Sequence, residues 1–301
     1  MSYLPFYITP EEFDEQCVVN KEQILKPTNV IHWIAKDVEH KNRYDRKLYC
    51  LVSSIFAFCC LMVPFAFASA LPLLFFGDES AYGFSVVMWL IFFIVSYANY
   101  LQCGLSDRYE YVFSNKGFSY SKQLDQPDWV NSVAQKVAYV ACVFCVFAVV
   151  YIGPMALAGA GGSLLLAFGM TKKQTVYADH RFSSTEQFLY AQFNRRRKVM
   201  ALYHKFDSCD YGDTAHTIIT RCQQRGISYV FFNSDEDIDK ILDFLTQNTN
   251  IKIEEIGDVK GLFDFKYYPQ SIAEIKEIFG EYPVDEATSR RGEPAPVMSD
   301  S

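Results

Sequence analysis

The sequence lacks the residue patterns that mark a catalytic or metal-binding site. Its five histidines include no HExxH motif and no paired metal-ligand spacing. Its nine cysteines fit neither a disulfide framework nor a zinc site. Asn-x-Ser/Thr acceptors and a recognisable signal peptide are also absent. We therefore predict no catalytic residue, no metal and no cofactor, and the pattern leaves open whether the chain is an enzyme.

Acidic residues outnumber basic ones, and the basic residues are distributed unevenly along the chain. The net charge is −7, which argues against a general nucleic-acid-binding role. Residues 171–205 contain eight Lys or Arg against two acids, whereas residues 206–301 contain nine against nineteen. A basic segment is thus followed by an acidic one.

Charged residues are missing from the long apolar runs that dominate residues 48–170. Runs near 20 residues have the length of a membrane crossing. The predicted fold class is a multi-pass α-helical membrane protein, with about four transmembrane helices in two hairpins and a C-terminal soluble α/β (or α+β) domain. The expected divisions are an N-terminal helical segment at 1–47, a first hairpin at 48–103, a loop at 104–132, a second hairpin at 133–170, an α/β domain at 171–281 and a disordered tail at 282–301.

The basic residues at 36–47 and 171–205 flank these runs, so they predict an orientation with both termini in the cytoplasm. The expected location is the cell membrane, most simply a bacterial cytoplasmic membrane. Residues 133–170 are barely long enough for two crossings, and a re-entrant hairpin is the alternative. Within this segment, small residues at helical spacing predict close helix packing, namely Ala156, Gly159, Ala160 and Ser163.

Residues 109–120 show the alternation of a β-hairpin. Aromatic side chains alternate with polar ones on both sides of the turn Asn115-Lys116-Gly117. A lone hairpin is marginally stable. We therefore expect this one to dock on residues after 171.

Helix signals occur on both sides of the apolar region. Thr9-Pro10-Glu11-Glu12 predicts a helix start, and 29–47 is interpreted as a second, amphipathic helix. Further on, a capping box at 183–186 predicts a helix through Phe193, while 199–206 fits a helix or a strand. The remaining expected elements are a short helix at 213–225, a strand at 227–232, a helix at 235–247, a strand at 251–256 and a helix from 271.

Three groups of residues are candidates for chemistry. Arg195, Arg196, Arg197 and Lys198 could contact lipid headgroups, although a solvated basic face is the simpler interpretation. Cys209 with Asp210, Asp213 and His216 reads first as a polar loop. Asp235, Asp237 and Asp239 lack the Gly and Glu of a calcium loop, and so fit an acidic first turn of a helix.

The function predicted is that of a membrane-anchored, non-enzymatic protein whose cytoplasmic domain binds or regulates a partner. The expected partners are the lipid bilayer and a protein, or a second copy of the chain, with no nucleic acid. Two alternatives stay open. One is a membrane enzyme that acts on a lipid or small molecule, with Asp210, Asp213, His216 and Asp235 to Asp239 as its residues. The other is a subunit of a channel or transporter.

Overall fold

The computed structural model describes residues 3–27, 30–67, 99–127, 178–264 and 268–295, together with scattered residues from 86 to 97 and from 129 to 139. The chain forms two compact units. Unit 1 consists of Met1–Arg43, Arg108–Lys122 and Ala178–Ser301, and unit 2 of Tyr44–Asp107 and Gln123–Tyr177. Each unit therefore combines segments that are far apart in the sequence.

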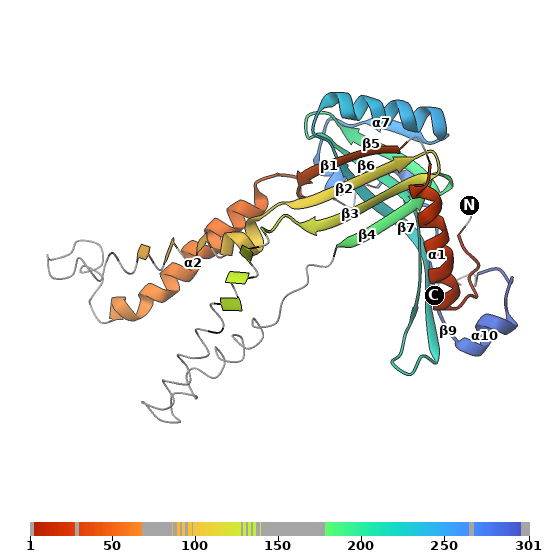
Figure 1. The fold of residues 1–301 in the computed structure, drawn as a ribbon, viewed down its shortest axis with the longest axis horizontal. Coiled ribbons are helices and arrows are strands. Elements are labelled where there is room, and N and C mark those ends of the chain that lie inside the picture. Colours follow the sequence, from red (N-terminus) through yellow and green to blue (C-terminus); the bar gives the residue numbers. More distant parts are fainter. Residues whose placement is uncertain are drawn as a thin grey trace. The chain divides into compact units, whose positions relative to one another are not determined.

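Unit 1 is built on two β-sheets (Figure 1). The four-stranded sheet has the order β1 (Val30–Asp37), β2 (Asp107–Ser114), β3 (Gly117–Leu124), β4 (Asp179–Ser184). The five-stranded sheet has the order β8 (Lys252–Glu255), β5 (Phe188–Asn194), β6 (Val199–Tyr211), β7 (Ile218–Phe231), β9 (Ile278–Pro283). In the second sheet β5 and β8 are parallel, and the other neighbours are antiparallel.

Short helices accompany these sheets. They are α1 (Pro10–Leu25), the 3-10 turn η3 (Thr185–Gln187), α7 (Asp235–Asn248), α8 (Lys260–Phe263), α9 (Gln270–Ala273) and α10 (Val284–Ser289). The predicted start of α1 is confirmed, because Thr9 and Glu12 form a capping box. The predicted helix at 235–247 is also confirmed, and Ser234 and Asp237 cap it in the same way. α10 lies where the sequence predicted a disordered tail.

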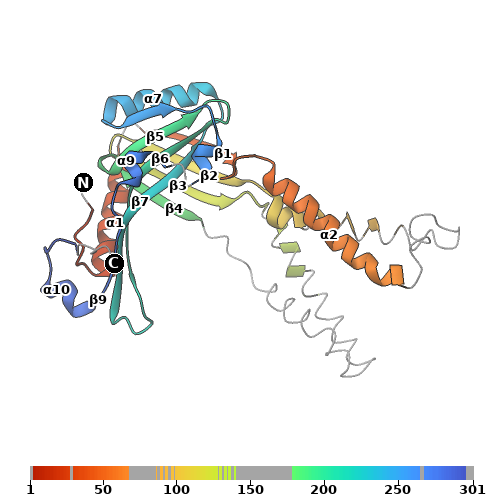
Figure 2. The same cartoon turned by 180° about the vertical axis from the view of Figure 1, so that it is seen from behind.

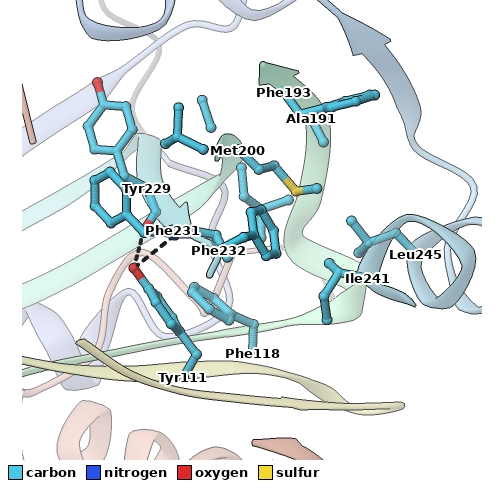
Figure 3. Packing of buried hydrophobic residues seen from close by; sticks show 14 of the residues in the cluster. Tyr111, Phe118, Ala191, Phe193, Met200, Tyr229, Phe231, Phe232, Ile241 and Leu245 are labelled. Carbon is cyan, nitrogen blue, oxygen red and sulfur yellow. Dashed lines mark hydrogen bonds between the residues drawn. The ribbon is translucent and has the colours of Figure 1, made fainter. Parts of the chain in front are cut away.

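The predicted hairpin is present as β2 and β3, and it packs against residues after 171. Tyr109, Tyr111 and Phe113 are fully buried. The Tyr111 hydroxyl donates to the Tyr229 carbonyl at 2.9 Å and accepts from the Phe231 amide at 3.2 Å (Figure 3). The docking expectation is therefore confirmed, and one aromatic side chain of the first sheet is bonded to the backbone of the second.

The second sheet is buried on both faces near its centre. Val199 to His204 are consecutive residues of β6, and all six are buried. Consecutive side chains point to opposite faces, so both faces must be covered. Ile238, Ile241 and Leu245 of α7 belong to the same core, with exposures of 0–1%. α7 therefore covers part of one face of the second sheet (Figure 2).

Three predicted helices are strands in the structure. Residues 30–37 form β1, in which half-buried Trp33 stacks on Tyr111 and Phe232. The capping box is formed by Ser184 and Gln187, one residue later than predicted, and it opens only η3 before β5 begins. Ile218 and its successors form β7, in keeping with their β-branched side chains. These helix predictions were wrong because pairing with neighbouring strands in the sheets outweighed the local capping and periodicity signals.

The last predicted helix, from Ser271, is shorter than expected. α9 contains only four residues, and Ile278 already begins β9. The ambiguous stretch at 199–206 is a strand. The strand expected at 251–256 is confirmed as β8, and it pairs with β5 in parallel.

Unit 2 begins with α2 (Asp45–Phe67) and contains the π-helical turn η2 (Tyr100–Gly104). The Asn99 amide, which precedes η2, donates to the hydroxyls of Ser53 and Ser54 at 2.7 and 3.1 Å. Arg46 and Asp107 form a two-pronged ion pair at 2.8–2.9 Å. These bonds join the start of α2 to the residues around η2.

Among the described residues, no helix is long and apolar enough to cross a membrane. This finding contradicts the predicted multi-pass membrane protein with about four transmembrane helices; the described chain is a mixed α/β protein with two sheets. The prediction relied on the apolar runs at 48–103 and 133–170. The structure describes 48–67 as part of α2, and 68–85 lie outside the described residues. The second predicted hairpin at 133–170 lies largely outside the described residues, as do Ala156, Gly159, Ala160 and Ser163.

Candidate functional site

The most distinctive feature of unit 1 is a three-stranded extension of the second sheet, which we call the arm. It consists of residues 206–211 of β6, 218–224 of β7 and 278–283 of β9. The β6–β7 hairpin extends beyond the part of the sheet that is covered by α7 (Figures 1 and 2). Because side chains alternate between the faces of a strand, the arm has two distinct faces.

The N-terminal segment, residues 3–8, is bound to one face of the arm through Arg221. Arg221 is completely buried, and its guanidinium pairs with Asp207 at 2.5 Å. It also donates to the carbonyls of Leu4 and Pro5, while the Leu4 amide donates to Asp207 at 2.8 Å. A buried cation needs a counter-charge and hydrogen-bond acceptors, and the segment supplies some of the acceptors. The segment is therefore an integral part of the fold.

Aromatic packing reinforces this attachment. The Tyr282 hydroxyl on β9 bonds to the carbonyl of Phe6 at 2.9 Å and to the amide of Ile8 at 3.1 Å. The rings of Phe6 and Tyr7 lie 5.9 and 5.1 Å from that of Tyr282. One face of the arm is therefore sealed by an apolar cluster beside the buried ion pair of Arg221 and Asp207. Sequence reasoning missed it, because its contacts join residues more than 200 positions apart.

The polar candidates at 209–216 lie at the far end of the arm, and they do not form a nucleophile site. Cys209 is buried on the sealed face, where burial raises the pKa of its thiol to about 12. Asp213 accepts from Thr217 within the turn, and this hydrogen bond lowers the pKa of its carboxyl. His216 stacks on Tyr211 at 4.1 Å. The polar-loop interpretation therefore fits the geometry.

The acidic candidates at 235–239 lie at the other end of β7. Asp237 is engaged with Ser234 at the start of α7. Since β7 rises about 3.3 Å per residue, Asp213 and Asp235 are roughly 40 Å apart. The two groups that a membrane enzyme would need together are thus separated. Among the described residues, no group of three or more His, Cys, Asp or Glu could hold a metal ion.

The basic run at 195–198 is the turn between β5 and β6. Arg197 is buried and pairs with Asp37 through two bonds of 2.7–2.8 Å. Arg195 pairs with exposed Asp239 at 2.6 Å, and Lys198 donates to the Asn233 carbonyl at 3.1 Å. Arg196 is exposed. Three of the four cations thus bind other parts of unit 1.

A cavity of about 160 Å³ lies near the base of the arm, and His204 is one of its lining residues. The ring has a partner on each side: Nδ1 lies 3.1 Å from the Lys205 carbonyl, and Nε2 lies 2.9 Å from the Ser228 hydroxyl. A carbonyl only accepts, so Nδ1 holds the proton and Nε2 accepts from Ser228. Burial lowers the pKa of His204 to about 4.

Acid is therefore expected to destabilise unit 1 through His204. Between about pH 6.5 and pH 4 the unfolded chain binds a proton here and the folded chain does not, so the free energy of unfolding falls as the pH falls, by roughly 3 kcal/mol in total. Denaturant titrations at several pH values should show this dependence, and His204→Gln should lose that part of it. Equal pH dependence in both proteins would contradict the assignment.

The described residues define a mixed α/β protein built on two sheets, in which the candidate groups at 209–216 and 235–239 lie far apart. The chain belongs to the TsiV2 immunity protein family, whose sequence profile matches residues 14–274. That range contains β1 to β8 and most of α1.

A curated relative supports the assignment over a shorter stretch. The immunity protein TsiV2 of Vibrio cholerae serotype O1 (strain ATCC 39315 / El Tor Inaba N16961) is 37% identical over 79 residues, which are 24% of this chain and 33% of that protein. The alignment thus spans about a third of the relative's length. No solved structure matches the chain significantly.

These comparisons correct the functional prediction. A membrane-anchored, multi-pass protein located in the cell membrane is contradicted by the family and by the lack of a spanning helix among the described residues. The predicted lipid bilayer partner and association through membrane helices are not supported. The expectation of a protein partner agrees with membership of a family of immunity proteins.

Proposed function

We propose that this chain is an immunity protein, which protects a cell by binding a protein toxin and blocking its action. The observation that carries this proposal is the family match over residues 14–274. Binding, unlike catalysis, requires a stable surface rather than a set of reacting groups. The two-sheet core and the buried ion pair of Asp37 with Arg197 supply a rigid framework for such a surface.

The positions of the polar candidates support binding over chemistry. Asp213 is used within its own turn, and Asp237 caps α7. Cys209 is sealed beneath the N-terminal segment, where its thiol donates to the Ile8 carbonyl. These three side chains have structural partners. Among the described residues, their geometry therefore favours binding over catalysis.

A competition experiment between sister strains tests the proposal. Deleting the gene for this chain should make a strain sensitive to contact with its parent, and a plasmid copy should restore survival. The toxin is then the parental gene whose removal abolishes killing. Purified toxin and purified full chain should form a complex in titration calorimetry. Full survival of the deletion strain, or killing without a complex, would contradict neutralisation by binding.

A further inference from the structure

On the face of the arm opposite the N-terminal segment, the side chains are exposed or half-buried, and none of them is buried. The strand register fixes its side chains: Ser208, Cys222 and Phe279 form one row across the three strands, and Asp210, Thr220 and Glu281 form the next. Ile218 and Pro283 form a third row at the end of the arm. We call these eight residues the open face.

The two faces of the arm differ sharply in burial. Ile219 and Arg221, on the sealed face, are both 0% exposed. Their neighbours on the open face, Ile218 and Phe279, are 39% and 48% exposed. Ile218 and Phe279 lie at the two ends of the open face, on either side of the row that contains Asp210, Thr220 and Glu281. Exposed apolar side chains with polar residues between them occur in interaction surfaces. Phe279 is also the kind of aromatic side chain that anchors interfaces.

The open face combines this apolar surface with negative charge. Asp210 and Glu281 flank Thr220 in one row, so their strands lie about 10 Å apart at a spacing of roughly 4.8 Å. Both carboxylates are exposed, and neither has an ion-pair partner in the described part of the chain. Over the whole sequence after residue 205, acids outnumber bases by nineteen to nine. A complementary partner would present Lys or Arg beside apolar side chains.

We propose that the open face is the centre of the docking site for the toxin, and that it receives a basic, partly apolar surface of that protein. The inference rests on the proposed function. Six residues of strand and three strands give an area of about 20 by 14 Å. A stable interface needs roughly 800 Å² per partner. The open face therefore supplies the anchoring centre, with neighbouring residues around it.

Two substitutions test the face in the full chain against the toxin identified by the competition experiment. Phe279→Ala should weaken the Kd by about tenfold or more, because it removes the apolar anchor. Glu281→Lys should also weaken binding about tenfold or more, and low salt should enlarge the difference. Leu25→Ala, at 46% exposure on α1, and Asp243→Lys, on the outer side of α7, are the matched controls and should bind like the wild type. Wild-type affinity in both open-face variants would overturn the proposal while leaving the immunity function intact.

A photo-crosslinking residue in place of Phe279 provides a readout that does not depend on immunity. In the native host, the expected crosslink joins position 279 to a segment with Lys or Arg beside apolar residues, and the same probe in place of Gln247 on α7 should not form it. Crosslinking to a second copy of this chain, or no crosslink at 279, would overturn the docking site. If position 279 crosslinks to a basic protein but the chain does not protect the cell, the open face is a binding surface and only the proposed immunity function is refuted.

Discussion

Replacing Asp37 with Ala is expected to lower the free energy of unfolding by about 3–5 kcal/mol, since it leaves a buried cation without its counter-charge. The carboxylate is 3% exposed and accepts two bonds from Arg197 and one from Arg43. The Arg197 side chain, only 8% exposed, would retain bonds to the carbonyls of Val38 and His40. Those neutral acceptors compensate a buried charge only in part. Denaturant unfolding of the purified chain measures the loss.

The same β5–β6 turn offers a matched control. Arg195 pairs with Asp239 across an exposed surface, where the two side chains are 41% and 55% exposed. Asp239→Ala should therefore cost less than about 1 kcal/mol. The double variant Asp37→Ala/Arg197→Met should be more stable than Asp37→Ala alone, because no unpaired charge remains buried. If Asp37→Ala and Asp239→Ala lowered the free energy of unfolding by similar amounts, burial would not determine the strength of these ion pairs.

Truncating Leu245 to Ala is expected to cost about 2–5 kcal/mol, because the vacated volume lies in a packed core. Leu245 is 0% exposed and lies on the face of α7 that contains Ile238 and Ile241 (Figure 3). Gln247→Ala, at an exposed position two residues later, should change stability by only about 0.5 kcal/mol or less. Thermal or denaturant unfolding of both variants checks the prediction. A loss below about 1 kcal/mol for Leu245→Ala would mean that α7 does not belong to the main core.

Elements whose cause lies within a few residues could be predicted from the sequence. The start of α1 depends on Thr9 and Glu12, three positions apart, and the start of α7 on Ser234 and Asp237. The β2–β3 hairpin follows from a short turn and from alternating aromatic side chains. Capping and alternation depend on residues only a few positions apart. They therefore predict an element correctly wherever tertiary contacts do not favour another structure.

Elements whose partners are distant were decided by tertiary structure. Residues 188–194 follow a valid capping box, yet they form β5, because β6 on one side and β8 on the other bond to this backbone. Strand formation depends on which neighbours are present, and the local sequence does not specify them.

The candidate site shows the same division. The sequence by itself determined that the region after residue 205 is acidic, that its histidines and cysteines lack ligand spacing, and that no catalytic motif is present. Only the tertiary structure decided that Arg197 is buried and Arg195 exposed, although they are two positions apart in one turn. It alone covered one face of the arm with residues 3–8 and left Ile218 and Phe279 exposed on the other. Burial is set by what packs against a residue, and here the packing partners are up to 276 positions away in the chain.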